Sequence, residues 1–101
     1  MASRIELQSK LESILESKNV YFQPPATVRM KYPAIVYSLD WIDTIHAEDN
    51  PYNSRNRYSV IFMTDDPDSP IIQKLASLPL CRFDRYYAVD NLNHYTYNLY
   101  F

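Results

Sequence analysis

The chain has 101 residues and a formal net charge of −2, from 10 Lys and Arg against 12 Asp and Glu. Hydrophobic residues make up 47% and charged residues 22%, a composition that excludes a disordered chain. The length predicts a single domain, 1–101, whose small core would benefit from a partner surface. The acidic balance gives no global attraction to nucleic acid, and no apolar run approaches the roughly 20 residues of a membrane-spanning helix.

Three residue counts narrow the function classes further. Glycine is absent, which excludes phosphate-binding loops and nucleophile elbows, because both need backbone that only glycine adopts. Left-handed turn positions should therefore use Asn or Asp. The expected positions are Asn19, Asn50, Asn53, Asn91 and Asn93. The single cysteine, Cys81, excludes an internal disulfide and favours an intracellular setting, and the 10 tyrosines favour sheets and interfaces.

The first predicted elements are a helix and a short strand. Apolar residues at helical spacing predict a helix over 4–18. Ser3 and Glu6 form a capping box at its start, and Asn19 is its expected stop. The β-prone stretch 20–22 follows and is ended by two prolines.

A long antiparallel hairpin is predicted next. Alternation over 34–46 predicts a strand with one apolar face, on which Trp41 lies with Ile35, and a second face that is half apolar. Residues 47–54 have the composition of a turn, and 55–64 form the returning strand. The first strand is longer than the usual 5–6 residues, so the hairpin should project beyond the core.

A second helix and a second hairpin complete the predicted fold. Ser69 as N-cap and Pro70 as first helical residue begin a short apolar helix that Pro79 ends. Strands over 80–89 and 94–101 are joined by a short polar loop. The predicted fold is α+β in the order α-β-β-β-α-β-β, with a mainly four-stranded antiparallel sheet, a projecting hairpin and two helices.

Two groups of residues could carry chemistry, and each has a structural explanation. Three aspartates precede the second helix, but this segment lacks the glycine and the later Glu that an EF-hand calcium loop needs. Their attraction to the positive end of the helix dipole explains them better. A thiol and two histidines lie on three different predicted strands, which does not assemble a nucleophile and its base. These residues are Asp65, Asp66 and Asp68, and Cys81, His46 and His94. The sequence therefore predicts no catalytic, cofactor or metal site.

The outer half of the long hairpin is the candidate subunit interface. It concentrates Trp and Tyr, the residue types most enriched at interface hot spots, and two arginines on a later strand could add polar contacts. The candidate interface residues are Trp41, Ile42, Ile45, Tyr52, Tyr58, Arg82 and Arg85. In the same hairpin, Asp40 and Asp43 differ in strand parity and should not form a carboxylate pair.

Four segments from the first helix to the last strand carry a family resemblance. They are Asn19-Val-Tyr-Phe-Gln-Pro-Pro, Met30-Lys-Tyr-Pro-Ala-Ile-Val-Tyr, Asp65-Asp-Pro-Asp-Ser and Asp90-Asn-Leu-Asn-His. Together they resemble the tail terminator (tail completion) or neck proteins encoded among the head-to-tail joining genes of tailed bacteriophages. These motifs are turns and strand starts, so they carry structure rather than a chemical signature.

The resemblance implies a virion protein of the tail and neck, assembled in the host cytoplasm, that is not an enzyme and needs no cofactor. It implies a homo-oligomeric ring, a hexamer, that contacts the tail tube protein and a head-side connector or stopper while DNA passes through the lumen. Carboxylates do not hold phosphates, so an acidic stretch should face that lumen, and Arg82 and Arg85 should point away from it. The stretch consists of Asp40, Asp43, Glu48 and Asp49.

Two alternatives remain open at this point. One is a connector adaptor or stopper of the same neck. The other is a small non-viral binding module that uses Arg82 and Arg85 with neighbouring tyrosines, a combination that can stack on single-stranded nucleic acid. The mass of the particle in solution separates the module from the ring proteins, and the position in an assembled particle separates terminator from stopper.

Overall fold

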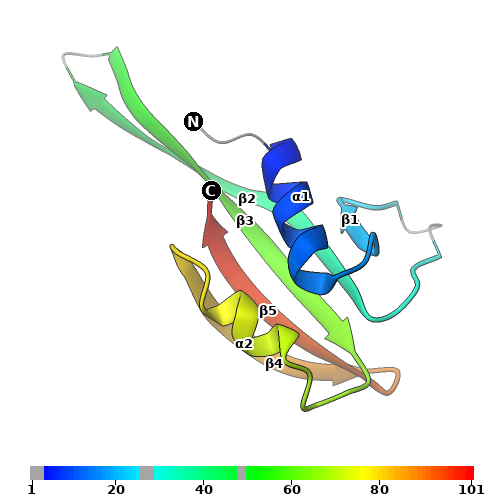
Figure 1. Cartoon of the computed structure of the whole chain (residues 1–101). Helices are drawn as coiled ribbons and strands as arrows, with labels where there is room; N and C mark the ends of the chain where they lie inside the picture. The colour runs from blue at the N-terminus through cyan, green and yellow to red at the C-terminus, as the bar shows by residue number, and fades with distance from the viewer. Residues whose placement is uncertain (1–3, 26–28, 48–49) are drawn as a thin grey trace.

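The computed structural model describes residues 4–25, 29–47 and 50–101. Within the hairpin, the side chains of 43–47 and 50–55 lie outside the described part. The elements are α1 (Arg4–Leu15), β1 (Val20–Phe22), β2 (Ala34–Ala47), β3 (Asn50–Thr64), α2 (Ile71–Ala76), β4 (Cys81–Val89) and β5 (Leu92–Tyr100), as Figure 1 shows. The α+β class and the order of elements are as predicted.

The strands form one five-stranded sheet in the order β1-β2-β3-β5-β4. The four long strands are antiparallel to their neighbours, but β1 pairs in parallel with β2, with Val20 opposite Ile35. The sheet is therefore mixed and five-stranded, so the prediction of a mainly four-stranded antiparallel sheet is wrong about β1. Alternation within a strand carries no information about the direction in which a distant segment pairs with it.

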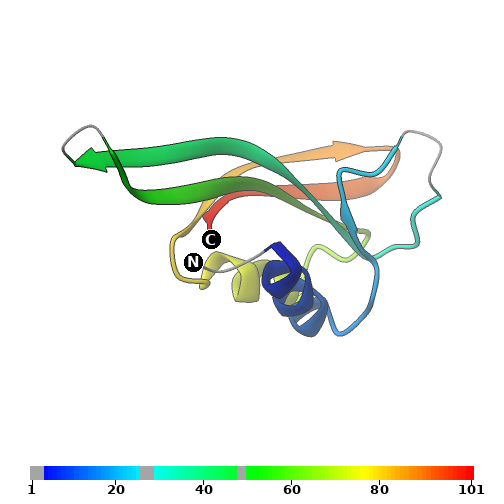
Figure 2. The ribbon, with the colours of Figure 1, turned by 90° about the horizontal axis from the view of Figure 1, so that it is seen from above.

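Both helices cover the same face of the sheet, as the view from above shows (Figure 2). The strand register aligns side chains into rows across that face. The rows are Ile35–Phe62–Tyr95–Tyr86, Tyr37–Val60–Tyr97–Phe83 and Leu39–Tyr58–Leu99–Cys81. The helices add Leu7, Leu11, Leu15, Ile71 and Leu75 to the core. Neither of the two described helices lies on the other face of the sheet.

The β2–β3 hairpin extends well past the helices and past β5 (Figure 1). The pairing continues from Trp41 opposite Arg57 to Ala47 opposite Asn50, and the molecule is 51 Å along its longest axis. A projecting hairpin was predicted. The polar stretch 47–54 was expected to be a turn, but most of it belongs to the two strands, because cross-strand pairing extends them into sequence of low β-propensity.

A β-bulge lies where the hairpin leaves the core. Leu39 is opposite Tyr58, whereas Trp41 is opposite the adjacent residue Arg57, so Asp40 is the extra residue. The bulge reverses the alternation of side chains. Trp41 therefore lies with Arg57 on the uncovered face, where the guanidinium carbon is 5.8 Å from the centre of the indole ring. The prediction that Trp41 shares a face with Ile35 is wrong for this reason.

The helix boundaries differ from the predicted ones by one to three residues. α1 ends at Leu15 because Glu16, rather than Asn19, adopts left-handed backbone at φ 60°. The proposed capping residue Ser3 lies outside the described residues. α2 begins at Ile71 with Pro70 at its N-cap position, so the helix starts one residue later than predicted. The Ser69 hydroxyl still accepts the Ile71 N–H at 3.3 Å.

Candidate functional site

β4 is an outer strand of the sheet, and every one of its residues after Cys81 is exposed. Its exposed side chains include large apolar ones on both faces. They are Phe83, Tyr86, Tyr87 and Val89. An outer strand leaves a row of backbone N–H and C=O groups unpaired, and an exposed apolar edge of this kind is a template for pairing with another chain. The sequence predicted this strand but gave no sign that it lies at an edge.

The hairpin provides a second free edge on the other side of the sheet. β1 pairs with β2 only from Ile35 to Tyr37, and the next outward N–H, that of Leu39, donates to Gln23 Oε1 at 3.1 Å. Beyond Leu39, no described strand lies beside β2 on that side. Trp41 and Ile42 are 57% and 56% exposed at the start of this free segment. We call the segment Trp41–Ala47 the arm edge.

The uncovered face of the sheet is mostly polar. Two rows cross all four long strands, Val36–Ile61–Thr96–Arg85 and Ser38–Ser59–Asn98–Arg82. At the bulge, Asp40 Oδ2 lies 2.9 Å from Arg57 Nη2 and 3.0 Å from its Nε. This ion pair neutralises one of the three arginines whose side chains the structure describes on this face.

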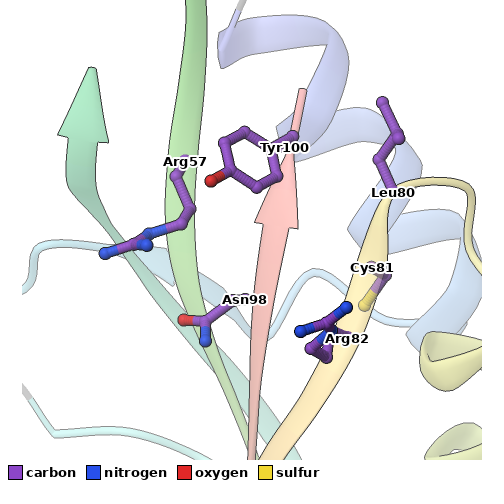
Figure 3. Close-up of a pocket in the computed structure, with 6 residues that line it drawn as sticks. All are labelled: Arg57, Leu80, Cys81, Arg82, Asn98 and Tyr100. Carbon is purple, nitrogen blue, oxygen red and sulfur yellow. The ribbon is translucent and has the colours of Figure 1, made fainter. Parts of the chain in front are cut away.

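A hollow of about 420 Å³ lies around the second arginine, Arg82 (Figure 3). Asn98 and Tyr100 of β5 and Arg57 of β3 line it, together with Leu80 at the edge. Arg82 makes no ion pair with any other residue that the structure describes. It is therefore the arginine of this face that a carboxylate or phosphate of a partner could reach.

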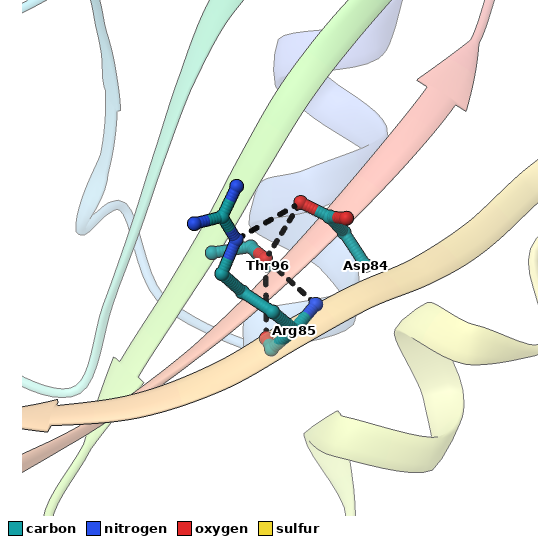
Figure 4. Close-up of polar contacts among 3 residues, drawn as sticks. All are labelled: Asp84, Arg85 and Thr96. Carbon is teal, nitrogen blue, oxygen red and sulfur yellow. Dashed lines mark hydrogen bonds and ion pairs between the residues drawn. The ribbon is translucent and has the colours of Figure 1, made fainter.

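The third arginine, Arg85, is held within its own chain (Figure 4). Its backbone N–H donates to Thr96 Oγ1 at 3.0 Å, and the Thr96 hydroxyl lies 3.1 Å from the Arg85 carbonyl oxygen. Asp84 Oδ2 is 3.4 Å from both Arg85 Nε and Thr96 Oγ1. These contacts lie at a second bulge, between Phe83 and Arg85, and add side-chain hydrogen bonds to the pairing of β4 with β5.

The structure separates the candidate interface residues into three groups. Trp41 and Ile42 are exposed on the arm, and Arg82 and Arg85 are exposed on β4. Tyr58 is only 4% exposed and packs edge-on against Tyr37, with ring centres 5.9 Å apart, so it belongs to the core and not to an interface. The side chains of Ile45 and Tyr52 lie outside the described residues.

The candidate lumen region is described only at Asp40. The side chains of Asp43, Glu48 and Asp49 lie outside the described residues. The alternation that separated Asp40 from Asp43 does not apply, because the bulge interrupts it. Asp40 lies on the same face of the sheet as Arg82 and Arg85, so the acidic region and the two arginines are not segregated to opposite faces.

The residues considered for chemistry have structural roles. Burial raises the pKa of the Cys81 thiol to about 11, which keeps it protonated and weakly nucleophilic at neutral pH. His94 Nδ1 lies 3.1 Å from the Leu92 carbonyl oxygen, and its ring stacks on Tyr87 at 4.8 Å. The side chain of His46 is outside the described part.

The acidic segment before α2 forms a turn. Asp66 Oδ1 accepts the Asp68 N–H at 2.9 Å, and the Asp66 N–H donates to the Thr64 hydroxyl. Among the residues that the structure describes, no three His, Cys, Asp or Glu side chains are grouped to hold a metal ion. Neither of the two described helices has the length and apolar character needed to cross a membrane.

Comparison with protein-family models, curated proteins and solved structures found no match to this chain.

Proposed function

We propose that this chain is a structural subunit of the bacteriophage head-tail interface, in which copies form a ring that caps the tail tube and joins it to the head connector. DNA passes through the lumen of the ring. The observation that carries the proposal is the pair of free edges on opposite sides of one sheet, β4 and the arm edge. Two different surfaces that meet head to tail give a ring when the rotation closes.

The side chains at both edges support an assembly role. Trp41, Ile42, Phe83 and Tyr86 are each between 46% and 57% exposed, which is costly for large apolar groups on a chain that stays alone. Their burial would contribute about 25 cal/mol for each Å² of apolar surface removed from water. A protein of this length gains from such burial because its own core is small.

The phage setting is supported by the resemblance of the four segments, which extend over β1 and the residues beside it, the start of β2, the acidic turn and the β4–β5 turn. On this proposal the ring is a hexamer, one side of it contacts the tail tube protein, and the other side contacts a head-side connector or stopper. The protein acts by its shape and contacts, without catalysis or a cofactor. An adaptor or stopper position in the same neck uses the same edges and differs only in its neighbours.

Mass measurement and electron microscopy test this proposal together. The purified protein is examined by sedimentation velocity at tens of micromolar, alone and with isolated tail tubes, and the mixture is imaged in negative stain. We expect a closed ring of one stoichiometry and added density at the head-proximal end of the tubes. A strictly monomeric protein that leaves tube ends unchanged would contradict the proposal, and rings located only on the connector would favour the stopper position.

One observation favours the binding-module alternative. Arg82 is exposed and has no ion-pair partner in the described residues, and it lies near aromatic side chains on an uncovered sheet. The other two arginines of this face are each paired with a carboxylate, Arg57 with Asp40 and Arg85 with Asp84. A single unpaired arginine among the described side chains of this face gives little affinity for a phosphate chain, so the ring is the better-supported function.

A further inference from the structure

The two free edges run in opposite directions. Each junction between the four long strands is antiparallel, so β2 and β5 run one way and β3 and β4 run the other. A rotation about an axis roughly parallel to the strands carries one copy to the next without reversing the direction of any strand. When such a rotation brings the arm edge of one copy beside β4 of another, the new pair is antiparallel, like every other junction of the long strands.

The position of β1 decides how far neighbouring copies must be offset. Leu39 and Cys81 lie in the same row, and from that row β4 and the arm extend in opposite directions along the sheet. A neighbour without offset would bring β4 against β1, which occupies the rows of Ile35–Tyr37. We therefore shift the neighbouring copy along the strands by about six residues, or roughly 20 Å at about 3.3 Å per residue. In that position β1 of one copy lies just past Val89 of the other, and the arm lies beside β4.

The offset must also be even, because an odd offset would exchange the two faces of the sheet at the junction. Six is the smallest even offset that clears β1 in this register. It places Ile42 opposite Tyr86 on the helix-covered side and Trp41 opposite Tyr87 on the uncovered side. All four of these side chains are at least 36% exposed in the single copy. The backbone position of Asp43 then lies opposite that of Arg85, so residues of opposite charge share a pair of positions.

We infer that β4 of one copy pairs antiparallel with the arm edge of the next, with Trp41 opposite Tyr87 and Ile42 opposite Tyr86, so that the ring is one continuous β-barrel. This inference rests on the proposed ring. Four strands at about 4.8 Å give each copy a width of roughly 19 Å. An offset of about 20 Å over that width corresponds to a strand tilt of about 45°, at the upper end of the 35–45° of closed barrels.

The helices occupy the convex side of such a barrel, because an outer layer has the larger circumference, as in other barrels with helices outside. The uncovered face then lines the lumen. Among the described side chains, its three arginines and the two aspartates paired with them leave a net charge of +1 per copy on that lining, carried by Arg82. Arg82 and Arg85 face the lumen in this arrangement, in place of the outward position that the sequence suggested.

Disulfide trapping tests the pairing. In a Cys81→Ser background, Trp41→Cys and Tyr87→Cys are combined in one chain. Within one copy the two positions are separated by three strand junctions and about six rows. A disulfide needs Cα atoms about 4.4–6.8 Å apart, so these cysteines can bond only between two copies. The matched control combines Trp41→Cys with Arg82→Cys, which the proposed register keeps about four rows apart. Circular dichroism checks that each variant is folded before oxidation.

We expect oxidation to convert most of the Trp41→Cys/Tyr87→Cys protein into a ladder of covalent oligomers that ends at the ring, and the control to stay at least tenfold less cross-linked. Rings that form but cross-link no better than the control would overturn the pairing and leave the proposed function intact. Folded unsubstituted protein that forms no ring with or without tail tubes would overturn both.

A charge exchange gives a second, independent readout. Trp41→Glu or Tyr87→Lys alone should reduce the ring population at least tenfold, and the double variant should restore it, because the two positions face each other across the junction. Single variants that assemble normally, or a double variant no better than either single one, would count against this register.

Discussion

Asp40 and Arg57 form an ion pair at the bulge, with Oδ2 and Nη2 2.9 Å apart, at the point where the hairpin leaves the core. The same guanidinium lies over the Trp41 ring. One arginine therefore holds both the extra residue of the bulge and the largest exposed side chain of the arm. The pair is partly exposed, so its contribution to folding is small, and its main effect is on the position of Trp41.

Replacing Trp41 with Ala should weaken assembly without destabilising the single copy. An aromatic residue buried at the centre of an interface is worth at least about 2 kcal/mol, or more than tenfold in the dissociation constant. Its exposed position in the single copy predicts a change of less than about 0.5 kcal/mol in the free energy of unfolding. Sedimentation velocity and urea unfolding measure the two quantities. Ile5→Ala, at another exposed apolar position, is the control, and equal losses for both variants would refute the role of Trp41.

Replacing Tyr58 with Ala should instead destabilise the single copy. Tyr58 is 4% exposed and lies among Tyr37 and Leu99 in the core, so truncation leaves a cavity. We expect a loss of about 3–5 kcal/mol in the free energy of unfolding, the usual cost of truncating a large core aromatic. Chemical denaturation measures it. A loss below about 1 kcal/mol in the free energy of unfolding, together with impaired assembly, would indicate that Tyr58 belongs to the interface.

Stability should fall at alkaline pH. Desolvation raises the pKa of Cys81 from 9.0 to about 11 and that of Tyr97 from 10.0 to about 12 in the folded state. Above about pH 9 the unfolded chain loses these protons while the folded chain keeps them, so the free energy of unfolding decreases with rising pH up to about pH 12. Below about pH 9 these two groups cause no pH dependence.

Urea denaturation between pH 8 and pH 11 measures this decrease. Cys81→Ala should remove the part of the slope that begins near pH 9, since alanine has no proton to lose. Alkylation of Cys81 by iodoacetamide at pH 7.5 should likewise be far slower in the folded protein than in urea. Rapid alkylation of the folded protein would show that the thiol is not desolvated.

Replacing Leu80 with Asn should stabilise the protein. Leu80 has φ 58°, a conformation that costs an ordinary residue about 1–2 kcal/mol and that asparagine tolerates better. Its side chain is 59% exposed, so little packing is lost. We expect a gain of about 0.5–1 kcal/mol in the free energy of unfolding. Asp90→Asn, at a left-handed position already held by a tolerant residue, should change it by much less, and a loss in the Leu80 variant would show that its side chain is needed.

Duplex DNA should bind this protein only weakly. The uncovered face offers one cation without a partner among the described residues, so few phosphates can be neutralised. Filter binding near physiological salt should show dissociation constants no tighter than about 10⁻⁴ M, at the weak end of non-specific binding. Submicromolar binding that is lost in the Arg82→Ala/Arg85→Ala variant would favour the nucleic-acid module.

Most elements that depend on local pattern were predicted from the sequence, but the stop of α1 and the turn over 47–54 were not, and of the strand pairings the long hairpin was predicted while that of β1 was missed. Ser69 and Pro70 identified the start of α2, and Asp90 and Asn91 do form the left-handed hairpin turn. The bulge at Asp40 was not predicted, because a single inserted residue leaves the composition of the strand unchanged while it exchanges the faces beyond it. The core position of Tyr58 and the parallel pairing of β1 likewise depend on contacts far apart in the chain.

The candidate site could be predicted only in part from the sequence, for the same reason. Trp41 and Ile42 were predicted to lie in the interface from their residue type and their place in a strand longer than the core requires, and the structure leaves both exposed. The edge position of β4 was missed, since Phe83, Tyr86 and Val89 look in the sequence like the residues of an ordinary half-buried strand. Only the strand order of the sheet distinguishes a central strand from an outer one.

The absence of glycine affects the unfolded chain as much as the folded one. A domain of this length would ordinarily contain about seven glycines, and replacing each by another residue at a compatible position reduces unfolded-chain entropy by the equivalent of about 0.4–1 kcal/mol. Among the residues that the structure describes, five adopt left-handed backbone, namely Glu16, Gln23, Leu80, Asp90 and Asn91, so the expectation that Asn or Asp would take these positions is wrong for three of them. The chain therefore gives up fewer conformations on folding but keeps strain in its turns. Introducing glycine at these turns would relieve that strain while making the unfolded state more favourable.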